Sequence, residues 1–198
     1  MCNQFRTPSL AKIKQYLVND LSLPYVEQTE LDFPSQDIFP NQPAPVLLYD
    51  GQLHLAVKSW GYASPIDQKP LFNARVERFF DAKPSMWDES FAKRRCLILA
   101  DQFYESSPQT YTGKNGRRYH ERYLFQNPAQ PITLIAGIYE RDRFSMVTTA
   151  PNSTMAPIHN RMPLVIAPDE LRQWLFQNFT SLIDRSDIQL TYQKQAHK

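Results

Sequence analysis

The sequence predicts a single α+β domain built around a curved, barrel-like and mostly antiparallel β-sheet. Three observations predict this fold class. A chain of 198 residues has the length of one domain. Short apolar runs of strand length recur along it, joined by short links, whereas few stretches show helical periodicity. Neither an internal repeat nor a domain linker is apparent, so we take residues 1–198 as one domain.

The chain begins with a predicted helix over residues 8–20. Thr7-Pro8 has the pattern of an N-cap followed by proline in the first turn. Leu10, Ile13 and Leu17 then recur at helical spacing. Residues 23–45 hold five prolines and little periodicity, which predicts an irregular segment on a path fixed by proline.

A β-hairpin is predicted next, because Asp50-Gly51 separates two apolar runs, 46–49 and 53–57. A short helix is expected over 86–91, after Pro84. A second helix is expected to open at Pro168, with Trp174 on its buried face. Between these helices, strands are predicted at 96–99, 102–105, 119–125, 132–139, 144–149 and 162–167.

Composition narrows the class of protein. The chain is 42% hydrophobic and 21% charged, which is typical of a globular protein and excludes wholesale disorder or a collagen-like repeat. It lacks the run of about 18 apolar residues that a membrane-spanning helix needs, and its first residues lack the apolar core of a signal peptide. Two cysteines are too few for a disulfide framework. We therefore expect a cytoplasmic, monomeric protein with free thiols and without a membrane partner.

Basic and aromatic residues alternate over residues 114–122, although the formal net charge of the whole chain is only +2. Arg122 ends this run, and Tyr119 and His120 lie inside it. Such a pattern can track a phosphate backbone and stack on bases. On this feature alone a solvated hairpin is the more ordinary interpretation.

Cys2 is the first candidate for chemistry. Initiator methionine is normally removed when the next residue is small, which would leave Cys2 with an α-amine and a thiol on adjacent carbons. The ordinary pKa values of these groups, about 8 and about 8.5, leave some uncharged amine at neutral pH. A 1,2-aminothiol condenses with an aldehyde to an imine and then closes a thiazolidine ring. The same thiol could instead act as an N-terminal nucleophile, and a cysteine in second place also occurs by chance.

Three other polar positions are candidates. Glu105 lies among aromatic residues, where desolvation raises a carboxyl pKa towards the range of general acid–base catalysis. His159 lies in a polar loop, 150–161, between two apolar runs. Asn73-Ala74-Arg75 offers an amide and a guanidinium. Each has an ordinary structural alternative. Without a second ligand at metal-binding spacing, we expect no metal and no cofactor.

The order of these motifs resembles the SRAP family, the SOS-response-associated peptidases that are also regarded as abasic-site shields. The resemblance runs from residue 1 to about 176, and the C-terminal tail diverges. The motifs that carry it are Met1-Cys2, Pro40, Trp60-Gly61-Tyr62, Asn73-Ala74-Arg75, Arg95-Cys96-Leu97-Ile98, Ala100-Asp101, Phe103-Tyr104-Glu105, Ala136-Gly137-Ile138-Tyr139, Thr148-Thr149-Ala150 and His159-Asn160-Arg161-Met162-Pro163.

The resemblance implies a protein of the DNA damage response that binds abasic sites in single-stranded DNA and is nucleoid-associated when bound. Mature Cys2 would form a covalent thiazolidine cross-link with the ring-opened sugar, and the same imine would allow strand-cleaving lyase activity. Asn73 would contact the sugar and the amine. Glu105 would shuttle protons, and His159 would assist proton transfer at the sugar.

The resemblance also implies four DNA-binding residues. Arg75 and Arg161 would clamp flanking phosphates. Pro40 and Trp60 would form an apolar wall that interrupts stacking and kinks the strand. No cofactor is implied.

The sequence departs from the family pattern at three positions near the site. Gln4 stands where the family has arginine, Gln102 where it has glycine, and Ser106 where tryptophan is common. The family's C-terminal strand motif is not evident in residues 188–198. These changes leave covalent capture intact but put DNA affinity in question.

Two alternatives stay open, and the first uses the same residues. The first is a thiol peptidase or amidase, including one that removes its own Met1, with Cys2 as nucleophile, His159 as base and Glu105 as orienting group. The second is a non-catalytic nucleic-acid-binding module that uses the 114–122 hairpin.

Overall fold

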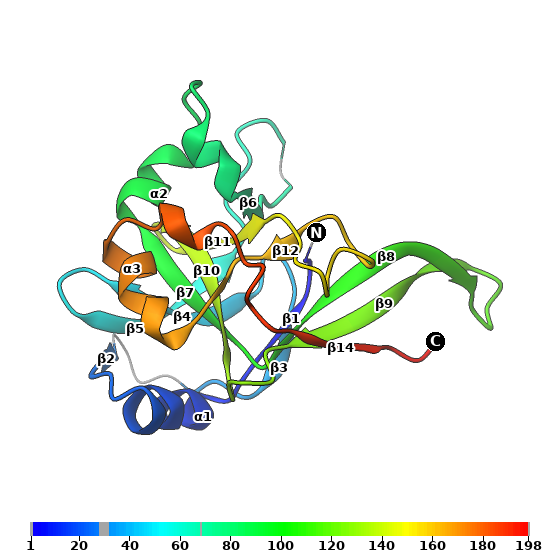
Figure 1. Cartoon of the computed structure of the whole chain (residues 1–198), viewed down its shortest axis with the longest axis horizontal. Helices are drawn as coiled ribbons and strands as arrows, with labels where there is room; N and C mark the ends of the chain where they lie inside the picture. Colours follow the sequence, from blue (N-terminus) through cyan, green and yellow to red (C-terminus); the bar gives the residue numbers. More distant parts are fainter. Residues whose placement is uncertain (1, 28–31, 68, 198) are drawn as a thin grey trace.

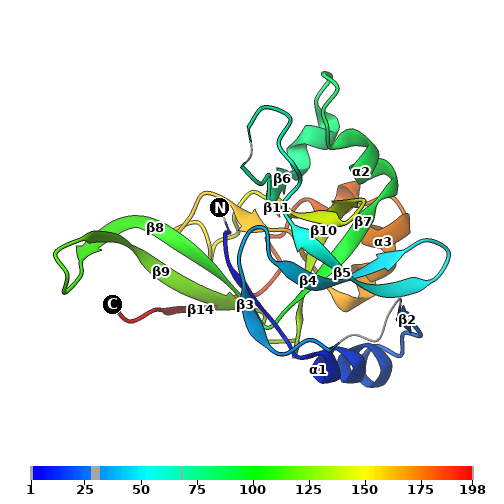
Figure 2. The same cartoon turned by 180° about the vertical axis from the view of Figure 1, so that it is seen from behind.

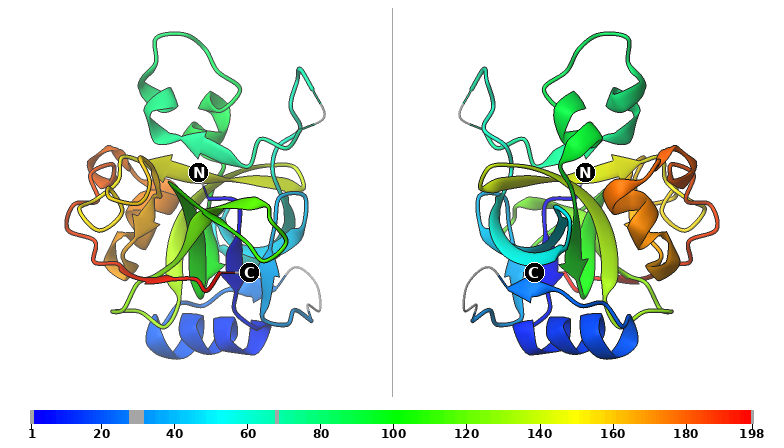
Figure 3. Two further views of the ribbon diagram at one scale, coloured as in Figure 1. Left: turned by 90° about the vertical axis from the view of Figure 1, so that its right-hand side faces the viewer. Right: turned by 90° about the vertical axis from the view of Figure 1, so that its left-hand side faces the viewer.

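Strands from distant parts of the chain close into a barrel in the computed structural model, which describes residues 2–27, 32–67 and 69–197. Strands β11 (Arg143–Thr149) and β5 (Leu53–Trp60) pair in parallel, with Phe144 opposite Trp60. This pairing closes a ring of five strands whose other pairings are antiparallel. Figure 3 shows the strands wrapping around a common centre. The α+β class and the barrel-like sheet are therefore confirmed.

The larger sheet contains the barrel. Its order is β12 (Met162–Pro163), β11 (Arg143–Thr149), β10 (Thr133–Glu140), β7 (Arg95–Ala100), β4 (Pro43–Tyr49), β5 (Leu53–Trp60) and β2 (Val26–Glu27). Two short strands attach to it, β13 (Val165–Ile166) beside β10 and β6 (Asn73–Arg75) beside β11.

The smaller sheet carries a long arm. Its order is β14 (Thr191–Lys194), β9 (Arg118–Gln126), β8 (Gln102–Thr112), β1 (Phe5–Thr7) and β3 (Gln36–Ile38). The far ends of β8 and β9 extend away from the body (Figure 1), and the C-terminal β14 runs along β9. The tail that diverges from the family motifs is thus part of this sheet.

Three helices cover the outside of the barrel. They are α1 (Leu10–Gln15), which continues as a π-helix over Tyr16–Asp20, α2 (Asp88–Lys93) and α3 (Leu171–Phe176). Figure 2 shows them on different sides of the strands. No helix in the described residues is long and apolar enough to cross a membrane.

Two hydrophobic clusters occupy the two faces of the barrel strands. The helices pack Phe91 and Trp174 against one face. The other cluster contains Phe5, Trp60 and Phe144, and Cys2 belongs to it. The N-terminal segment of the chain therefore packs into this second cluster, where Cys2 is fully buried.

Most predicted elements are present, with differences where tertiary pairing competes. Thr7 is not the N-cap, because it belongs to β1; the cap is Ser9, whose hydroxyl accepts a hydrogen bond from the Lys12 N–H. The irregular 23–45 segment contains β2, β3 and the start of β4. The strand predicted over 162–167 is divided into β12 and β13.

Candidate active site

Four side chains that are far apart in the sequence come from neighbouring elements. Cys2 precedes β1, Asn73 begins β6, Glu105 lies in β8 and His159 lies in the loop between β11 and β12. Pairing of β1 with β8 brings the first residues of the chain alongside Glu105.

Asn73 holds the backbone of Cys2. Its side-chain Nδ2 donates a hydrogen bond to the Cys2 carbonyl at 2.8 Å. Parallel pairing with β11, in which Asn73 lies opposite Met146, fixes the position of the asparagine. The contact places an amide from the middle of the chain on the second residue.

The Cys2 thiol is buried and neutral. Its Sγ donates to the carbonyl of Gln4 at 3.3 Å. Burial raises the pKa of this thiol well above its usual range, and the nearby Glu105 carboxylate raises it further. A thiol in this environment carries its proton at neutral pH, unlike the activated thiolate of a cysteine hydrolase.

Glu105 is the buried carboxyl of the site, with only 2% of the residue exposed. Burial raises its pKa to about 7, and a hydrogen bond from the backbone N–H of Cys2 opposes part of that shift. At neutral pH the group is divided between its protonated and charged forms. It can therefore both donate and accept a proton, as general acid–base catalysis requires.

His159 lies close to Glu105, with its Nε2 4.0 Å from a carboxyl oxygen of Glu105. Its Nδ1 lies 3.1 Å from both the backbone N–H and the carbonyl of Arg161. Burial lowers the pKa of His159, so the imidazole is neutral at neutral pH. A neutral ring can accept a proton.

Asn152 is a structural residue of the site that sequence analysis missed. Its side chain is 5% exposed, and its Oδ1 accepts the Met155 N–H at 3.0 Å. Its Nδ2 donates to the Ile188 carbonyl at 2.8 Å. These bonds anchor the loop that carries His159. An asparagine that begins a polar loop is the local signal for such a turn.

Arg161, which the family resemblance implies as a phosphate contact, forms an ion pair within the protein. Both of its terminal nitrogens bind the carboxylate of Glu77, at 2.6 and 2.8 Å. One of them also donates to the Thr148 carbonyl at 2.7 Å. Glu77 is half exposed, so the pair lies at the surface, and the phosphate contact expected of Arg161 stays a prediction. Arg75, by contrast, is exposed.

Trp60 is a correction, because none of its surface is exposed. Its ring contacts Phe5, and its Nε1 donates to the Phe72 carbonyl at 2.8 Å. The ring cannot form an exposed wall against DNA in this conformation. The backbone carbonyl of Trp60 accepts a hydrogen bond from the Asn41 N–H at 2.7 Å. Trp60 therefore supports the turn that carries half-buried Pro40. Phe39, 44% exposed, is the apolar surface beside that proline, and sequence analysis missed it.

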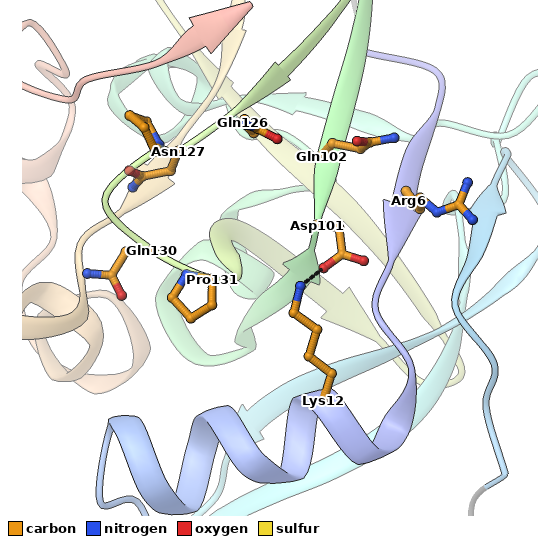
Figure 4. A pocket seen from close by; sticks show the side chains of 9 residues that line it. Arg6, Lys12, Asp101, Gln102, Gln126, Asn127, Gln130 and Pro131 are labelled. Atoms are coloured by element: carbon orange, nitrogen blue, oxygen red, sulfur yellow. Dashed lines mark hydrogen bonds and ion pairs between the residues drawn. The ribbon is translucent and has the colours of Figure 1, made fainter.

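A cleft of about 440 Å³ adjoins the site. It is lined by Ser106, Ser107, Pro108, Ala156, Pro157, Ile158, His159 and Asn160. A larger cavity, of about 540 Å³, contains none of the four candidate residues. There Lys12 is paired with Asp101 at 2.6 Å, as Figure 4 shows.

Across residues 2–27, 32–67 and 69–197, no three histidine, cysteine or acidic side chains gather as metal ligands. What the site does combine is a neutral thiol, a carboxyl that titrates near neutrality, a neutral imidazole and an amide. This set suits proton transfer around a carbonyl carbon.

Comparison with known proteins gives the site a context. A family model described as SOS response associated peptidase (SRAP) matches residues 1–197. The abasic site processing protein YedK of Escherichia coli is 32% identical over 139 residues, which cover 66% of this chain and 59% of that protein. The abasic site processing protein YoaM of Bacillus subtilis is 29% identical over 163 residues, covering 75% and 68%.

Solved structures share the fold. A crystal structure of a protein from Bordetella bronchiseptica has a TM-score of 0.73 at 17% identity and covers 98% of this chain and 100% of that one. One from Bacteroides thetaiotaomicron has a TM-score of 0.71 at 19% identity, covering 98% and 91%.

Proposed function

The chain belongs to the SRAP family, and we propose that it captures abasic sites in single-stranded DNA as a covalent thiazolidine on Cys2. The curated relatives are named abasic site processing proteins. The observation that carries the proposal is the position of the Cys2 nitrogen, which lies against the buried Glu105 carboxyl. Removal of Met1 converts that nitrogen into a primary amine, on the same residue as the thiol.

In the first step the amine attacks the aldehyde of the ring-opened deoxyribose. A C–N bond forms, protonated Glu105 donates to the carbonyl oxygen, and the ammonium formed on attack returns a proton to the Glu105 carboxylate. Protonated Glu105 then donates to the departing hydroxyl, water leaves, and the resulting iminium gives its N–H proton back to Glu105 to form the imine. A carboxyl with a pKa of about 7 suits both directions of transfer.

In the second step the sulfur adds to the imine carbon. A C–S bond forms, the S–H proton passes to the nitrogen, and the five-membered ring closes with a net loss of one water from the two reactants. The Cys2 thiol starts this step protonated, because burial raises its pKa. Attachment of amine and sulfur to one residue makes closure intramolecular and faster than hydrolysis of the imine.

The same imine supports a lyase reaction. Neutral His159 would accept the C2′ proton of the sugar, after which the 3′ phosphate leaves and the strand is cut. Ring closure at sulfur competes with this path. A single strand is the favoured substrate because the sugar must reach a buried residue, which a base-paired, stacked duplex opposes.

The peptidase alternative lacks a supporting observation in the geometry. A thiolate nucleophile needs a lowered pKa, but burial raises that of the Cys2 thiol. The imidazole Nε2 of His159 faces Glu105 at 4.0 Å. We therefore assign amine-first chemistry to the site.

The test is a denaturing gel of protein mixed with a single-stranded oligonucleotide that carries one abasic site. A slow-migrating product is expected with the wild type and not with Cys2→Ala. Cys96→Ala is the matched control, since Cys96 is the other buried free thiol, and it should keep the product. An oligonucleotide whose abasic sugar has been reduced to the alcohol should give none. A cross-link that survives Cys2→Ala would overturn the proposal.

A further inference from the structure

We propose that Arg122, on β9, binds a backbone phosphate of the DNA strand beside the site. The inference rests on the proposed function, because it takes the ligand to be the strand that carries the abasic sugar. Neither the motif resemblance nor the family's expected cations include this residue.

Arg122 lies next to the N-terminal segment of the chain, at Gln4. Its guanidinium donates a hydrogen bond to the side-chain oxygen of Gln4, two residues from Cys2. It also lies over the ring of Tyr104, 4.6 Å from the ring centre. The backbone carbonyl of Gln4 in turn accepts both the Cys2 thiol and the Tyr104 N–H. One short stretch of β1 and β8 thus positions both the guanidinium and the thiol.

The partners of Arg122 are neutral, so they orient the guanidinium without cancelling its charge. Within the described residues no carboxylate forms an ion pair with it, in contrast to Arg161, whose charge is taken up by Glu77. The adjacent acid, Glu121, points to the other face of β9 and is paired with Lys194 at 3.0 Å.

The guanidinium also keeps donors for a ligand. It has five N–H groups, and among the described residues it donates one hydrogen bond to a side chain. Ser106, directly opposite Arg122 on β8, is small and exposed. Arg122 itself is only half-buried. A preoriented, partly exposed guanidinium with its charge intact is suited to bidentate binding of a phosphate.

The arrangement also explains the amides at two positions where this sequence departs from its family. Gln4 is buried, with 4% exposed, and it supplies the acceptor that holds Arg122. Gln102 donates to the Tyr104 hydroxyl at 2.6 Å and so fixes the ring beneath the guanidinium. Arg122 on β9 thereby supplies the positive charge that the family has at position 4 and that Gln4 lacks.

The experiment measures binding of an intact single-stranded oligonucleotide, without an abasic site, as a function of salt. Each phosphate contact on a single strand contributes about 0.7 to the slope of log affinity against log salt. Arg122→Gln should therefore lower the slope by about 0.7, so that the affinity ratio of wild type to variant falls about 2.6-fold between 50 and 200 mM salt. Arg172→Gln, which removes the same charge from α3, is the matched control and should keep the slope.

Two further variants make the test independent of folding defects. Arg122→Lys keeps the charge and should keep the slope, although a lysine cannot bind bidentately. The exchange Gln4→Arg with Arg122→Gln returns a guanidinium to the other end of the same pair and should restore the slope that Arg122→Gln loses. An unchanged slope in folded Arg122→Gln, or an equal loss in Arg172→Gln, would overturn the inference.

The two proposals fail in different ways. If wild-type protein binds the intact strand with an Arg122-dependent slope but forms no cross-link with abasic DNA, the covalent chemistry is wrong and the phosphate contact stands. If the cross-link forms and the slope is independent of Arg122, only the phosphate contact is wrong.

Discussion

Replacing Glu105 by glutamine tests the acid–base role through protein stability, without any substrate. Glutamine has the shape of the protonated carboxyl and stays neutral at all pH values. The wild-type carboxyl has an ordinary pKa of 4.5 and, because it is buried, a pKa of about 7 in the folded protein. The folded state therefore binds more protons than the unfolded state between these two values.

The sign and size of the effect follow from that difference. The stabilisation that protonated Glu105 contributes to the free energy of unfolding is fully present below pH 4.5, and it is lost as the pH rises through 7. The shift, about 2.5 pKa units at 1.36 kcal/mol per unit, corresponds to about 3 kcal/mol. Other titrating groups are common to both proteins, so they largely cancel when the two are compared at each pH.

The assay is urea unfolding of wild type and Glu105→Gln at several pH values from 4.5 to 8. The free energy of unfolding of the wild type should fall by about 3 kcal/mol relative to the variant across this range. Equal pH dependence in the two proteins would show that Glu105 titrates near its ordinary pKa, and the proton shuttle assigned to it would then be refuted.

Three further predictions test the structural roles assigned above. The ion pair between Arg161 and Glu77 should show a coupling energy of about 1 kcal/mol in a double-mutant cycle measured by denaturant unfolding, and additive losses would contradict a structural pair. Trp60→Ala should cost about 3–5 kcal/mol of stability because the ring is fully buried. A stable variant that is defective only in DNA binding would instead support the DNA-contacting role predicted from the sequence. Asn152→Ala should cost about 1–3 kcal/mol by leaving buried backbone groups unpaired, and it should slow cross-linking by loosening the His159 loop; an unchanged rate would argue against that anchor.

Sequence analysis succeeded where the signal is local. Asp50-Gly51 specifies a tight turn whatever surrounds it, and the hairpin of β4 and β5 lies where it was predicted. The spacing of Leu171 and Trp174 defines one face of α3, which is the face that is buried. The four candidate residues are brought to one site, although the resemblance, rather than periodicity, selected them.

Sequence analysis failed where burial depends on pairing between distant strands. Tryptophan is common at DNA interfaces, but Trp60 is fully buried where β5 pairs in parallel with β11. No local pattern reports such a pairing. Arg122 was noted only as part of a basic run, because its contact with Gln4 joins residues 118 positions apart.

The measurement that tests the central claim most directly is the intact mass of the cross-linked product, followed by mapping of the modified peptide. We expect a protein without Met1, joined to the oligonucleotide with the loss of one water, and modified on Cys2 at both nitrogen and sulfur. A Cys2 adduct on a chain that retains Met1, or a linkage at any other residue, would contradict the mechanism.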